Sequence, residues 1–158
     1  MKALTILQPW AHLIAFGAKR VENRTWITGY HGPLVIHAGK SDRLITERDR
    51  ELYPAMAFGA IVAVAELVEC VRLGELNVPP WVVDHAYTEG PVCWILANVR
   101  PLHTPLPASG ARGLFDLPAH IVNRMWEILD ETEVSYETFE EPSGKKISLV
   151  SSIRKRGI

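Results

Sequence analysis

The most constraining feature of this sequence is the stretch of residues 8–26, which combines a short helical pattern, a glycine stop and an alternating polar segment. Pro9 suits the first turn of a helix, where the missing N–H of proline loses no hydrogen bond. Leu13 and Ile14 give this helix an apolar side, and Gly17 can adopt the left-handed backbone conformation that ends a helix. The sequence therefore predicts a short docked helix that stops at Gly17, after which the chain becomes extended.

The extended segment after the glycine is expected to bring charged groups and an aromatic ring together. Alternate side chains of a strand project from one face, so Glu22, Arg24 and Trp26 are predicted to share a face. Lys19 falls at the turn just before them. Such a group can hold a planar polar ligand, with the charged heads on its edge and the indole on its face. The alternative is that Glu22 and Arg24 form an exposed ion pair that contributes little to stability, while Trp26 fills the core.

Composition sets the broad class of the protein. The 158 residues are 47% hydrophobic and 22% charged, which is typical of a folded globular domain with its own core. The formal net charge of −1 excludes a strongly basic protein that coats nucleic acid, although it allows a local basic cleft. No apolar run is long enough to span a bilayer, and the N-terminal segment is a poor signal peptide. With Cys70 and Cys93 expected as free thiols, these features predict a cytoplasmic protein.

The remaining chain alternates between strand and helix patterns, which predicts an α+β fold. Strands are expected at 3–7, 34–38, 60–71, 91–99 and 114–117, with a short edge segment at 100–107. Helices are expected from Ser41 or Asp42 to Leu52, from Trp81 to Tyr87, and from Pro118 to about Leu129. Residues 147–150 are predicted to pair back on residues 136–139 through a turn at 142–145, and residues 154–156 to form a disordered basic tail.

Further candidate residues lie outside the first stretch. His37 is near the end of a predicted strand, Lys40 follows it closely, and a glycine-rich turn at 109–113 presents Arg112. The tripeptide that contains Lys40 lacks the glycine spacing of a P-loop, so we do not expect a nucleotide triphosphate site there. The histidines are scattered and no paired C-x-x-C exists, so neither a metal nor a cofactor is expected.

The pattern Q-P-W-A-x-L-I-x-x-G-x-K-x-x-E-x-R-x-W of residues 8–26 resembles the ASCH domain family. Similar segments follow at 32–40, 59–67, 92–96 and 110–115, so the resemblance covers about residues 3–118. The family consists of small β-barrel-like domains related to the PUA fold. The resemblance therefore implies a PUA-like small mixed β-barrel with flanking helices over residues 1–118. Residues 119–158 are then a C-terminal helix and hairpin packed on the same domain.

The resemblance also implies a function, namely binding of RNA, a nucleotide or a modified nucleoside in a cleft beside the first helix. Lys19, Lys40 and Arg112 are expected to face phosphate, while Glu22 and Arg24 read a base edge. Trp10 or Trp26 is expected to stack on the base. The full set of expected ligand-binding residues is Gln8, Trp10, Lys19, Glu22, Arg24, Trp26, His37, Lys40 and Arg112.

Catalysis is the alternative that the resemblance leaves open. Some relatives are amidohydrolases that remove an acyl group from N4 of acetylated cytidine, and they use the lysine that corresponds to Lys19 and a threonine nucleophile. Glu22 occupies the threonine position here, so Lys19 and Glu22 are the candidate catalytic residues. Ribonuclease activity and docking of a partner protein on the acidic C-terminal segment are further alternatives. The oligomeric state is left open.

Overall fold

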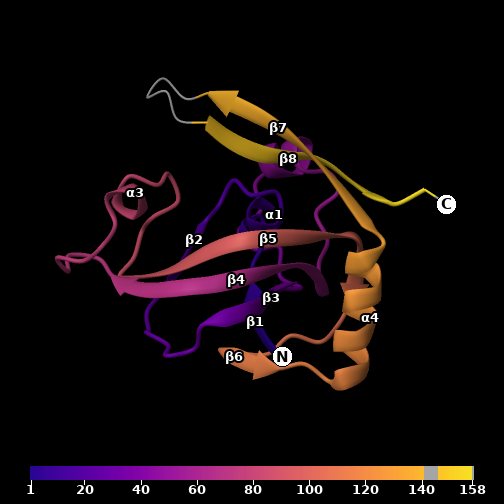
Figure 1. Ribbon diagram of the computed structural model, residues 1–158, viewed down its shortest axis with the longest axis horizontal. Coiled ribbons are helices and arrows are strands. Elements are labelled where there is room, and N and C mark those ends of the chain that lie inside the picture. The colour runs from indigo at the N-terminus through magenta and orange to yellow at the C-terminus, as the bar shows by residue number, and fades with distance from the viewer. Residues whose placement is uncertain (141–145, 158) are drawn as a thin grey trace.

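A curled six-stranded sheet forms the body of the protein, as seen in the computed structural model, which describes residues 1–140 and 146–157 (Figure 1). Its strands pair antiparallel except for β1 and β3, which are parallel. In spatial order the strands are β2 (Val21–Arg24), β5 (Val92–Pro107), β4 (Ala60–Arg72), β3 (Gly32–Ala38), β1 (Lys2–Ile6) and β6 (Leu114–Asp116). The predicted α+β class and barrel-like sheet are thus confirmed.

The strand alternation divides the core between the two faces of the sheet. On β3, Leu34 and Ile36 pack in the cluster that contains helix α1 (Trp10–Ala15), whereas Val35 packs in the cluster that contains α4 (Ala119–Asp130). Figure 1 shows α4 along one side of the sheet, well separated from α1. A third cluster joins α3 (Pro80–Val83) to the sheet at β2, β4 and β5.

The first helix is built as its sequence predicts. α1 ends at the C-cap Phe16, and Gly17 follows with φ +83°, a conformation that favours glycine. The amide N–H groups of Gly17 and Lys19 donate to the carbonyls of Ile14 and Leu13 at 3.0 and 3.1 Å. These bonds fix the turn that leads into β2.

Two predicted helices are shorter than expected. Helix α2 spans Glu47–Leu52, so the predicted start at Ser41 or Asp42 is wrong. Thr46 and Asp49 form a reciprocal capping box at distances of 3.1 and 2.9 Å, which fixes the helix start one turn later. Helix α3 ends at Val83 rather than continuing to Tyr87.

The proline-rich segment 100–107 is the second half of β5 rather than a separate segment. This half of β5 pairs with β4, whereas β2 pairs with β5 only at residues 92–95. Residues 100–107 therefore have a single strand partner, which is where prolines are tolerated in a sheet.

The C-terminal segment forms the predicted hairpin from β7 (Thr132–Glu140) and β8 (Lys146–Lys155), with Phe139 opposite Ile147. The predicted turn at 142–145 lies outside the described residues. The prediction of a disordered tail is wrong for Arg154 and Lys155, which belong to β8 and pair with Glu133 and Glu131 at 3.0 and 2.9 Å. Over the described residues, no helix is long and apolar enough to cross a bilayer.

Candidate functional site

A buried charge network lies where α1 turns into β2. The side chain of Lys19 is 3% exposed and donates to the Oε2 atom of Glu22 at 2.7 Å and to the carbonyl of Val21. The Nη2 atom of Arg24 lies 3.4 Å from Oε1 of Glu22 and donates to the carbonyl of Thr5 at 3.1 Å. The structure thus gathers an ammonium and a guanidinium around one carboxylate.

Part of this network opens into a pocket of about 150 Å³, here called the Lys19 pocket. Its aromatic wall is Trp10 and Tyr87, whose ring centroids are 5.9 Å apart at an interplanar angle of 66°. Asn23 holds the loop that carries Tyr87, because its side chain donates to the carbonyl of Tyr87 and accepts from the amide of Glu89. The lining consists of Trp10, Lys19, Glu22, Asn23, Tyr87 and Glu89.

A second, more open pocket of about 450 Å³ lies at the ends of β1 and β3, here called the His37 pocket. It presents two exposed cations, Lys40 and Arg112, and no carboxylate belongs to its lining among the described residues. The lining consists of Thr5, His37, Gly39, Lys40, Ser109, Gly110, Ala111 and Arg112. The arrangement is suited to an anion.

The hydrogen bonds of His37 define its tautomer. Its Nε2 atom lies 3.0 Å from the carbonyl oxygen of Ala108, and since a carbonyl only accepts, Nε2 carries the proton. Nδ1 is then the acceptor for the hydroxyl of Thr5 at 3.2 Å. A Cβ on Gly110 would lie 2.5 Å from Cε1 of His37 and 2.6 Å from Oγ1 of Thr5. Glycine at position 110 therefore allows its loop to cover the hydrogen bond between Thr5 and His37.

Acidification is expected to destabilise the protein through His37. Burial lowers the pKa of His37 below its usual 6.5; the bond to Ala108 opposes this effect, and the charge of Lys40 adds to it. The unfolded chain thus takes up a proton near pH 6.5 before the folded chain does, so the free energy of unfolding falls as the pH drops below about 6.5. At pH 5.5 the loss is at most about 1.4 kcal/mol per histidine. Urea denaturation at pH 7.0 and 5.5 measures it.

The control for this pH dependence is His37→Asn, which removes the titrating ring. Burial also lowers the pKa of His12, so the variant should retain a smaller loss of stability between the two pH values. A variant with the same pH dependence as the unchanged protein would show that His37 takes up its proton equally in both states.

Three of the expected ligand-binding residues, Gln8, Arg24 and Trp26, line neither pocket. Gln8 is fully buried, with Nε2 donating to the carbonyl of Ala57 at 2.7 Å and Oε1 accepting from the amide of His12 at 2.9 Å. Trp26 lies beyond the end of β2, with its ring edge-on to Trp94 at 4.7 Å. The prediction that Trp26 shares a strand face with Glu22 is wrong, because the strand ends at residue 24.

The other candidates divide between the pockets. Trp10, Lys19 and Glu22 line the Lys19 pocket, whereas His37, Lys40 and Arg112 line the other. Arg24 connects the two networks, since it contacts Glu22 in one and Thr5 in the other. No cluster of three or more histidine, cysteine or acidic side chains suited to a metal ion occurs in the described part of the chain.

The ASCH domain model matches residues 4–106, which is well over half of the chain. The chain belongs to the ASCH domain family. Three crystal structures of the ASCH protein from Zymomonas mobilis are similar to this ASCH protein. The unsubstituted one covers 80% of this chain and 94% of its own, with 14% identity and a TM-score of 0.51. A serine-to-alanine variant of it gives the same coverage with a TM-score of 0.52, and a tyrosine-to-phenylalanine variant shares 16% identity. At these identities the likeness shows the fold alone.

Curated relatives of this ASCH protein carry the name activating signal cointegrator 1. The human protein is 25% identical over 132 residues, which is 75% of this chain and 22% of the relative. The mouse protein is 33% identical over 81 residues, which is 43% of this chain and 14% of the relative. This chain therefore spans about a fifth or less of the length of these relatives.

Proposed function

We propose that this protein binds RNA or a nucleotide, with a base edge in the Lys19 pocket and phosphate beside Lys40 and Arg112. The observation that supports this most directly is the buried Lys19–Glu22 pair at the wall of a pocket flanked by Trp10 and Tyr87. A charged edge beside aromatic rings is the arrangement with which proteins hold an unstacked base.

The Lys19 pocket has hydrogen-bonding capacity left for a ligand. A carboxylate has about four acceptor positions, and Glu22 uses one on Lys19 at 2.7 Å with Arg24 farther away at 3.4 Å. Glu22 can therefore accept from a base amino or ring N–H group, while Trp10 or Tyr87 contacts a ring. Phosphate would lie outside this pocket, near the exposed cations of the His37 pocket.

The test is a titration with nucleosides, mononucleotides and short RNA oligomers. Lys40→Ala and Arg112→Ala are expected to weaken binding of phosphate-bearing ligands and to lower the salt dependence. For single strands, the slope of log K against log salt should fall by about 0.7 for each lost phosphate contact. Lys19→Ala should weaken binding of nucleosides as well.

Arg124→Ala is the matched control, because it removes an exposed cation from α4, where Arg124 pairs with Glu127 at 2.8 Å. It should leave binding unchanged. The proposal fails if no ligand shows saturable binding, or if Lys40→Ala and Arg112→Ala behave like Arg124→Ala.

A second candidate function is hydrolysis of an N4-acylated cytidine, which the contact between Lys19 and Glu22 within the pocket favours. Glu22 would act as a general base on water, since no serine, threonine or cysteine belongs to the described lining of this pocket. Incubation with N4-acetylcytidine decides this point. Release of cytidine that is lost in Glu22→Gln supports it, and no release at high protein concentration excludes it.

A further inference from the structure

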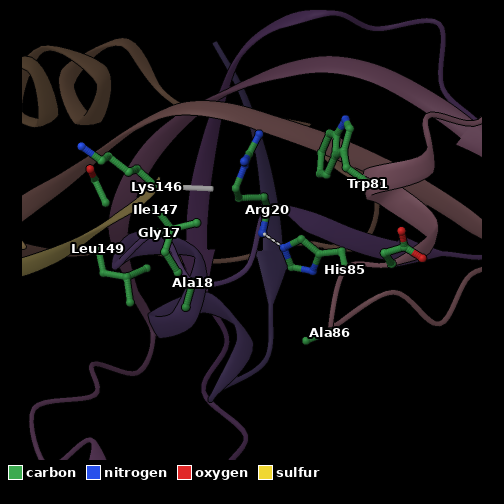
Figure 2. A pocket seen from close by; sticks show the side chains of 11 residues that line it. Gly17, Ala18, Arg20, Trp81, His85, Ala86, Lys146, Ile147 and Leu149 are labelled. Carbon is green, nitrogen blue, oxygen red and sulfur yellow. Dashed lines mark hydrogen bonds between the residues drawn. The ribbon is translucent and has the colours of Figure 1, made fainter. Parts of the chain in front are cut away.

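A large groove of about 610 Å³ lies between the end of α1, the segment around α3 and strand β8, and is here called the α3 groove. Figure 2 shows that all three parts of the chain contribute side chains to its lining. Its charged lining residues are Arg20, Lys146 and Asp84, and Trp81 is its large aromatic residue. None of these residues belongs to the Lys19 pocket or to the His37 pocket.

A guanidinium stacked on an indole forms one wall of the α3 groove. The Cζ atom of Arg20 lies 4.6 Å from the ring centroid of Trp81. The backbone amide of Arg20 donates to Nε2 of His85 at 3.3 Å, the bond that is dashed in Figure 2. Arg20 is exposed at this surface. A planar guanidinium held in this way can itself stack on a nucleobase.

A row of aromatic rings leads from the α3 groove to the Lys19 pocket. The centroids of Trp81 and His85 are 6.3 Å apart, those of His85 and Tyr87 are 5.8 Å apart, and those of Tyr87 and Trp10 are 5.9 Å apart. The interplanar angles lie between 50° and 66°, so no ring of this row lies flat on its neighbour. Adjacent residues also connect the two hollows, since Lys19 lines the pocket and Arg20 the groove.

We propose that the α3 groove and the aromatic row extend the binding site, so that the ligand is single-stranded RNA of several nucleotides rather than a free nucleotide. This inference rests on the proposed function of the Lys19 pocket. Interleaved rings and cations are how proteins hold single strands, because each base has a face for stacking and each phosphate needs a positive charge. In a duplex the base faces are covered, so this row cannot stack on them.

Binding of an RNA hexamer and of the corresponding mononucleotide to the full chain tests this inference. The unchanged protein should bind the hexamer more tightly than the mononucleotide and more tightly than a duplex of the same sequence. Trp81→Ala should weaken hexamer binding by about 5- to 150-fold, the range for loss of one stacked base, and leave mononucleotide binding unchanged. Arg20→Ala should also weaken hexamer binding. Because Arg20 is exposed, this change should leave the fold intact.

The chain contains a matched control in a second arginine–tryptophan pair, with Cζ of Arg100 lying 5.6 Å from the ring centroid of Trp126. Arg100→Ala should leave both affinities unchanged. Equal affinity for hexamer and mononucleotide, or Arg20→Ala behaving like Arg100→Ala, overturns the extended site. If Lys19→Ala still weakens mononucleotide binding in that case, the proposed function stands without the extension, whereas no binding by any ligand removes both.

Discussion

Glu22→Ala is expected to lower the free energy of unfolding by about 3–5 kcal/mol. The change leaves the ammonium of Lys19, whose side chain is 3% exposed, with the carbonyl of Val21 as its remaining described partner. A buried charge without its counter-ion loses the hydration that it has in the unfolded chain and gains too little in exchange. Urea denaturation monitored by tryptophan fluorescence measures the loss.

Two variants provide the comparison for Glu22→Ala. Glu22→Gln keeps the shape and one acceptor oxygen for Lys19, so it should cost less than the alanine change. Glu127→Ala breaks the exposed pair with Arg124 and should cost no more than about 1 kcal/mol. If Glu22→Ala cost as little as Glu127→Ala, the ammonium of Lys19 would have to reach water in the folded protein.

Trp94→Ala is expected to lower the free energy of unfolding by about 3–5 kcal/mol, the usual cost of removing a large buried ring. The Trp94 side chain is fully buried on β5, in the hydrophobic cluster that contains helix α1. Its Nε1 atom donates to the carbonyl of Trp26 at 3.2 Å, so truncation also removes the donor for this oxygen. Thermal and urea denaturation measure the change.

Trp26→Ala is the control for Trp94→Ala, because it removes the other ring of the same edge-on contact. Trp26 is 36% exposed, so its truncation removes less buried area and should cost clearly less. An equal loss from both variants would show that the contact between the rings, rather than burial of Trp94, dominates the effect.

Much of the fold follows from local sequence patterns. The two-residue alternation of 34–38 predicts which side chains face each way, and Leu34 and Val35 do lie in different clusters. Gly17 marks the end of α1 because few other residues adopt its conformation at low cost. The start of α2 is harder to predict, since Ser41, Asp42 and Thr46 are all acceptable caps and only the contact with Asp49 decides between them.

The candidate site could be predicted only in part. Lys19, Glu22 and Arg24 meet because they are close in sequence, and alternation places the latter two on one face. Tyr87 and Glu89 complete the Lys19 pocket from a loop more than sixty residues away, and no local pattern identifies them. Residues that the fold brings together from distant parts of the chain leave no trace in spacing along the sequence.

Arg24 joins two regions of the protein that the sequence separates. A single guanidinium holds the carboxylate of Glu22 and the carbonyl of Thr5, whose hydroxyl in turn bonds His37. If one ligand contacts Glu22 and another contacts Thr5, this guanidinium is the direct route by which each can influence the other. Any such coupling changes the affinity of the two ligands by the same factor, whichever binds first.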